Sequence, residues 1–124
     1  MSYKVIEMPH VVLTGDIDSE KSFNVLEDIM IKLPDGLLKT TNHYLDKNKQ
    51  TILIESLAIQ NGNKIGFLAM INNREDGIVI RIYPGLDIEK TDRVKQILAE
   101  IAKKLLNKIP KISVDKTNLQ EFLR

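Results

Sequence analysis

Residues 51–83 read TILIESLAIQNGNKIGFLAMINNREDGIVIRIY, and this stretch predicts three antiparallel strands in a meander. Two apolar runs, residues 51–59 and 64–71, flank the tetrapeptide Gln60-Asn61-Gly62-Asn63. Asn-Gly between apolar runs is a strong hairpin signal, because both central residues of a type I′ turn need positive φ. The turn pairs Gln60 with Asn63, so we expect Ala58 opposite Ile65. The same register then places Ser56 opposite Phe67, Ile54 opposite Ala69 and Ile52 opposite Ile71.

A third strand, residues 78–83, follows the polar connection 72–77. We align Ile71 with Ile78, which places Ala69 beside Ile80 and Phe67 beside Ile82. Side chains alternate between the two faces of a sheet, so one face becomes almost entirely apolar. This predicted core face comprises Ile52, Ile54, Ser56, Ala58, Ile65, Phe67, Ala69, Ile71, Ile78, Ile80 and Ile82.

The opposite side of these strands, which we call the second face, is also largely apolar. Its members are Leu53, Glu55, Leu57, Ile59, Lys64, Gly66, Leu68, Met70, Val79, Arg81 and Tyr83. A sheet face that is open to water should be polar. The alignment puts Glu55, Leu68 and Arg81 in one row, and we interpret a Glu55–Arg81 contact as an exposed ion pair of little energetic value. The surface as a whole predicts a partner that covers it.

The chain before residue 51 predicts two extended segments, a helix and a further strand. Residues 3–8 and 11–14 are extended, and Asp18 or Ser19 is suited to cap a helix that follows. Apolar residues at helical spacing, Phe23, Leu26, Met30 and Leu33, carry that helix to the breaker Pro34-Asp35-Gly36. Residues 37–45 predict a strand of undetermined register, so the faces of His43 and Tyr44 stay open.

The chain after residue 83 predicts the longest helix, about 88–108, capped by Asp87 or Thr91 and ended by Pro110. Residues 111–124 either dock as a short strand and a turn of helix or lie loose. The expected fold class is α+β: an antiparallel meander sheet of about five strands (β-α-β4-α), packed on one face by two helices, the C-terminal one longest. We expect a single domain over 1–124, with its core in 5–109 and an extension over 110–124.

Composition limits the classes of function. The chain has 124 residues, 43% of them hydrophobic and 28% charged, with a net charge of +1 and no cysteine. These values predict a globular protein of a reducing cytoplasm without a membrane span, and no overall field that would recruit nucleic acid. The many Ile and Lys residues fit a thermophile and equally an AT-rich genome.

The order of these elements resembles the TATA-binding-protein-like fold and, in shortened form, the helix-grip fold of START and Bet v 1 proteins. The resemblance covers roughly residues 5–109 and lies in the element order alone. The helix-grip likeness implies an apolar ligand cavity between the sheet and the long helix. The TATA-binding-protein likeness implies a sheet presented to DNA, which would need two copies of this chain and more basic residues on the second face.

Side chains that could carry chemistry are few, and each has a simpler interpretation. His10 and His43 stand alone, without other ligands at metal-binding spacing. Asp16, Asp18 and Glu20 precede a helix, where capping explains them without a metal. We therefore expect no metal, no cofactor and no catalytic site; an enzyme ranks third, with Glu55, Arg81 and His43 as its candidates.

Two functions follow from the faces of the sheet. The first is a small non-catalytic protein that self-associates, as a homodimer, or binds a protein partner. Its partner face would be Leu53, Glu55, Leu57, Leu68, Met70, Val79, Arg81 and Tyr83. The alternative is a helix-grip-like carrier of a small apolar ligand, whose cavity would be lined by Ser56, Ala58, Phe67, Ala69 and Ile101.

Overall fold

A computed structural model describes residues 8–85 and 87–124; the expected strand over 3–8 lies outside this range except for Met8. One antiparallel sheet of seven strands forms the body, in the order β2-β3-β4-β5-β6-β1-β7. The strands are β1 (His10–Gly15), β2 (Met30–Leu33), β3 (Gly36–Leu45), β4 (Thr51–Gln60), β5 (Asn63–Arg74), β6 (Gly77–Ile82) and β7 (Ile112–Thr117). The helices are α1 (Ser19–Val25), α2 (Asp92–Lys108) and the 3₁₀ turn η1 (Gln120–Phe122). The α+β class and the longest, C-terminal helix are confirmed, but the sheet has seven strands and not about five.

The β4–β5 hairpin has the register that the turn predicts. Gln60 pairs with Asn63, Ala58 with Ile65, and the ladder continues to Ile52 and Ile71. Asn61 and Gly62 both have positive φ, 51° and 84°, as a type I′ turn requires. Local turn chemistry therefore sets the central register of the sheet.

The β5–β6 register differs from the prediction by two residues. Ile71 lies opposite Ile80, and Asn73, not Ile71, lies opposite Ile78. The polar residues that suggest a loop, from Asn72 to Arg74, continue β5, and Arg74 pairs with Gly77 across a two-residue turn. A shift of two preserves the face of every side chain, so the two predicted faces survive the correction.

The predicted helix over about 20–33 is wrong in its second half. Helix α1 begins after Asp18, whose side chain accepts a hydrogen bond from the Lys21 amide at 2.8 Å, and it ends at Val25. Met30–Leu33 instead form β2, which pairs with β3. The buried Thr40 hydroxyl fixes the entry to β2 by accepting a hydrogen bond from the Ile29 amide at 2.9 Å.

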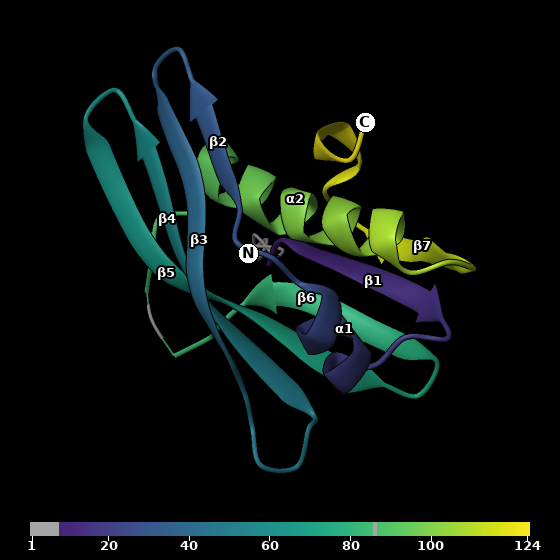
Figure 1. Ribbon diagram of the computed structural model, residues 1–124. Coiled ribbons are helices and arrows are strands. Elements are labelled where there is room, and N and C mark those ends of the chain that lie inside the picture. The colour runs from purple at the N-terminus through teal and green to yellow at the C-terminus, as the bar shows by residue number, and fades with distance from the viewer. Residues whose placement is uncertain (1–7, 86) are drawn as a thin grey trace, which may run out of the picture.

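The core lies between the sheet and the two α-helices. The sheet curves around α2, and α1 lies on the same side (Figure 1). One buried cluster unites core-face residues of the sheet with Val94, Ile97, Leu98, Ile101 and Leu105 of α2. Thr91 caps α2, and the C-terminal segment docks as β7 and η1, so that Leu119 is 1% exposed. Because both helices cover the core face, the second face is left without a helix in the described part of the chain.

Candidate interaction surface

Strand pairing brings the predicted partner-face residues together on the second face. Leu53 pairs with Met70, Glu55 with Leu68, and Leu57 with Gly66. Leu53, Glu55, Leu57, Leu68 and Val79 are partly exposed, Arg81 and Tyr83 are exposed, and Met70 is buried. Apart from Met70, each of the eight residues is therefore open to a partner to some extent.

The expected row of Glu55, Leu68 and Arg81 does not form, because the β5–β6 register differs. Arg81 lies opposite Met70, and its Nε donates a hydrogen bond to the Asn72 Oδ1 at 3.1 Å. The Glu55 carboxylate has other partners, so our interpretation of a Glu55–Arg81 ion pair is wrong.

Glu55 is held by strand β3 through a bulge that the sequence does not reveal. Register shifts between Thr40 and His43, so that the extra residue lets Thr41 and Asn42 both face Glu55. Asn42 Nδ2 donates to Glu55 Oε2 at 2.9 Å, and the Tyr44 hydroxyl donates to Oε1 at 3.2 Å. Partial burial, followed by the neighbouring Glu55 carboxylate, raises the pKa of Tyr44, which favours the protonated hydroxyl that donates this bond.

The same bulge decides the faces of the two residues that the sequence leaves open. Tyr44 pairs with Leu53 and therefore belongs to the second face, where it is 50% exposed. His43 pairs with the core-face residue Ile54 and lies edge-on to the Phe23 ring, with centroids 6.1 Å apart. Tyr44 is thus a second-face residue that sequence reasoning missed, because only the bulge decides to which face its side chain points.

Basic side chains surround the apolar centre of the second face. Alternation from the paired residues puts the following cations on this face: Lys32, Lys39, Lys64, Arg74, Arg81 and Lys116. The first three flank Leu37, Leu57 and Ile59 near the β2–β3 and β4–β5 turns, and the others lie towards β1 and β7. The net charge of the chain does not indicate this arrangement, because the chain as a whole is almost neutral.

The residues of the expected apolar cavity are packed into the core. Ser56, Ala58, Phe67, Ala69 and Ile101 are between 0% and 6% exposed. Ile101 and Ile54 border a crevice near His43 that has no room for a water molecule, about 0 Å³. Of the five residues, Ala58 alone also lines a large pocket of about 530 Å³.

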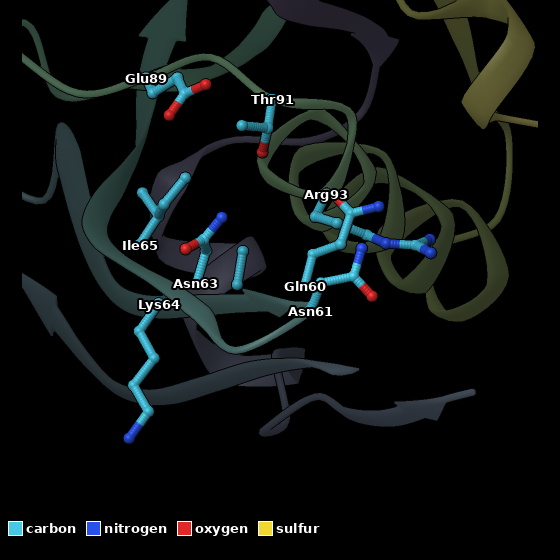
Figure 2. A pocket seen from close by; sticks show the side chains of 9 residues that line it. Gln60, Asn61, Asn63, Lys64, Ile65, Glu89, Thr91 and Arg93 are labelled. Carbon is cyan, nitrogen blue, oxygen red and sulfur yellow. The ribbon is translucent and has the colours of Figure 1, made fainter. Parts of the chain in front are cut away.

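That large pocket opens between the β4–β5 turn and the start of α2, and Figure 2 shows the side chains around it. Its lining is mostly polar: Gln60, Asn61, Asn63, Lys64, Glu89, Thr91 and Arg93 accompany Ala58 and Ile65. The Arg93 guanidinium is already engaged, because it donates to Asp35 and to Gln96 Oε1. The pocket therefore lacks the apolar walls expected of a carrier for an apolar ligand.

The acidic residues before α1 act as caps and surface ion pairs. Asp18 caps the helix, Asp16 pairs with Lys21, and Glu20 pairs with Lys49. The Lys21 ammonium holds the pKa of Asp16 below its usual value. Among the described residues, no group of three or more His, Cys, Asp or Glu side chains is placed to hold a metal. His10 donates from Nδ1 to the Met8 carbonyl at 2.9 Å.

Comparisons of the whole chain with protein-family models, with curated proteins and with solved structures found no significant match. The helices in the described ranges include none that is long and apolar enough to cross a bilayer. The second face combines an apolar centre with basic margins.

Proposed function

We propose that this protein is a non-catalytic binding protein that engages a protein chain, in the simplest case a second copy of itself, through the second face. The observation that carries the proposal is the partly exposed cluster of Leu53, Leu57 and Leu68, on the side of the sheet that the described helices leave uncovered. Large contiguous apolar surfaces on soluble proteins are typical of interaction sites.

The surface is suited to binding because its shape is fixed before a partner arrives. Leu57 and Leu68 project from β4 and β5, which are paired over all of β4 near the centre of the sheet. The Asn42 and Tyr44 side chains hold the Glu55 carboxylate at the middle of this surface. A pre-formed surface loses little conformational entropy when it binds.

The charges of the second face are compatible with a two-fold pair. In such a pair the same surface serves both copies, so each contact occurs twice. A two-fold axis that passes beside Glu55, and not through it, would bring this carboxylate of each copy near Lys39 or Lys64 of the other. Arg74, Arg81 and Lys116 would then stay at the margin. Opposite charges across an interface favour the correct orientation more than they add affinity.

The test is the mass of the protein in solution, measured by light scattering on a size-exclusion column. We expect twice the chain mass at high concentration, and a return to the single-chain mass for Leu68→Asp. The control is Val114→Asp, which adds the same charge at an apolar residue that is 37% exposed but pairs with the core-face residue Leu13. A wild-type chain that stays monomeric, or a Leu68→Asp chain that still dimerises, would contradict self-association.

The alternative of a carrier for an apolar ligand stays a prediction. Its support is that Ala58 reaches a pocket of about 530 Å³ beside α2. The polar lining of this pocket and the burial of Ala69 and Ile101 favour the interaction surface instead.

A further inference from the structure

A second pocket lies on the second face, away from the apolar cluster of β4 and β5. It measures about 340 Å³ and is lined by Met8, His10, Val12, Arg74, Val79, Arg81 and Lys116. Six of these residues belong to four neighbouring strands, β5, β6, β1 and β7, and Met8 lies just before β1. The pocket therefore exists only in the assembled sheet.

Strand register explains why these side chains converge. Val12 of β1 pairs with Val79 of β6 on one side and with Lys116 of β7 on the other. His10 pairs with Arg81, one step along the same strands. Residues that are directly paired lie on the same face, so two valines form a floor with basic groups around it.

The floor is apolar and closely packed. Val12 is 3% exposed although it faces away from the helices, and Val79 beside it is partly exposed. The His10 ring is tied back to the chain by its bond to the Met8 carbonyl. A small apolar group resting on the exposed part of Val79 would be shielded from water on that side.

The margin carries positive charge that the described part of the chain does not neutralise. Arg74, Arg81 and Lys116 are exposed, and none of them forms an ion pair with a described residue. The bond from Arg81 Nε to Asn72 fixes the plane of the guanidinium and leaves its two terminal amino groups available. Guanidinium groups favour oxyanions that accept two parallel hydrogen bonds, namely carboxylates and phosphates.

We propose that this pocket binds a phosphate monoester that carries a small apolar group. The phosphate would lie between Arg74, Arg81 and Lys116, and the apolar group would rest on Val79, beside the almost fully buried Val12. Three cations match the charge of a phosphate monoester better than that of a carboxylate. This site shares Val79 and Arg81 with the proposed protein–protein surface, but it is argued from the pocket and does not depend on self-association.

The experiment is a titration of the ¹⁵N-labelled full chain with phenyl phosphate, followed by amide chemical shifts. We expect saturable shifts centred on Val12, Val79 and Arg81, weaker binding of inorganic phosphate, and no shifts with benzyl alcohol. Arg81→Gln and Lys116→Gln should each weaken the binding of phenyl phosphate by about tenfold, as expected for loss of one charge-assisted contact. The control Lys47→Gln removes the same charge from an exposed loop residue outside the pocket and should leave the affinity unchanged.

Three results would overturn the proposal: no shifts with phenyl phosphate, equal affinity for inorganic phosphate, or equal weakening by Lys47→Gln. The last would mean that overall charge, not the pocket, attracts the ligand. Both pocket variants change exposed side chains, so their spectra should remain those of the folded protein. Leu57→Asp separates the two proposals, because Leu57 lies on β4 away from Arg81. It should abolish self-association and leave the binding of phenyl phosphate intact.

Discussion

Arg93 and Asp35 form an ion pair that ties the first turn of the long helix to the turn between β2 and β3. Arg93 Nη2 donates to both carboxylate oxygens of Asp35, at 2.8 Å and 3.0 Å. Asp35 also receives a hydrogen bond from Gln60 Nε2 at 3.2 Å, and its carbonyl accepts one from the Asn61 amide at 2.7 Å. One aspartate therefore joins α2, the β2–β3 turn and the β4–β5 turn.

The pair predicts a pH dependence of stability. The hydrogen bond from Arg93 holds the pKa of Asp35 below its ordinary value of 3.8, so the folded state binds this proton less readily than the unfolded state. The stabilisation is then complete above pH 3.8 and is lost as the pH falls through the lowered pKa of the folded state. Asp35→Asn should lower the melting temperature at pH 7, and its difference from the wild type should shrink as the pH falls below 3.8.

Circular dichroism melts from pH 7 downwards would measure this difference. Asp28→Asn is the control, because Asp28 is exposed and has no side-chain hydrogen bond with a described residue. Its difference from the wild type should stay near zero throughout. A constant gap between Asp35→Asn and the wild type at all pH values would contradict a role for the Asp35 charge.

Gly36 is predicted to tolerate no side chain. A Cβ added there would lie 1.8 Å from the Ile59 carbonyl oxygen, a backbone atom that cannot rotate away. Gly36→Ala should therefore lower the free energy of unfolding by roughly 1–3 kcal/mol, the range for overpacked sites. Gly66→Ala is the matched control, because a Cβ at Gly66 would meet nothing within 4 Å. Urea denaturation of both variants would show whether the close approach of β3 and β4 matters.

Ala69→Leu tests whether the core has room for a ligand. Ala69 is fully buried on β5, opposite Ile54 and Ile82. In a filled core the larger side chain should cost roughly 1–3 kcal/mol in the free energy of unfolding. Chemical denaturation gives this value directly. A variant as stable as the wild type would reveal empty space and would favour the carrier alternative.

Thr40→Val tests the hydrogen bond between the Thr40 hydroxyl and the Ile29 amide, which lies between α1 and β2. Thr40 is 2% exposed, and its hydroxyl is the acceptor for the Ile29 amide. Valine has nearly the same shape but leaves this buried N–H without its partner, at a cost of about 1–3 kcal/mol. Thr40→Ser keeps the hydroxyl and should be closer to the wild type when both are unfolded in urea. Equal loss in the two variants would point to packing and not to the hydrogen bond.

The predictions that proved accurate rest on interactions between residues near one another in the sequence. Asn61 and Gly62 specify a turn whose geometry sets the β4–β5 register, and Asp18 and Thr91 cap the helices that follow them. These signals act over a few residues, so the sequence alone contains them.

The errors arose where distant partners decide between two local possibilities. Met30 and Leu33 fit the stripe of a helix, but pairing with β3 makes this segment a strand. Asn72 and Arg74 have the polarity of a loop, yet they extend β5 against β6. The candidate surfaces were missed for the same reason. Tyr44 joins the second face only through the bulge opposite Glu55. The basic pocket forms only when β7 pairs with β1.

The position of β1 between β6 and β7 has a consequence for vectorial synthesis. This early strand finds both of its neighbours late, and its His10 amide bonds to the Asn118 side chain, 108 residues away. On the ribosome, the strand that contains Val11 and Leu13 therefore has no partner strand at first. The hairpins of β3 to β5 can already form during that time. Such long-range pairing slows folding and prolongs exposure of apolar strands. The nascent chain should thus be most prone to aggregate, or most dependent on chaperones, until β7 has emerged.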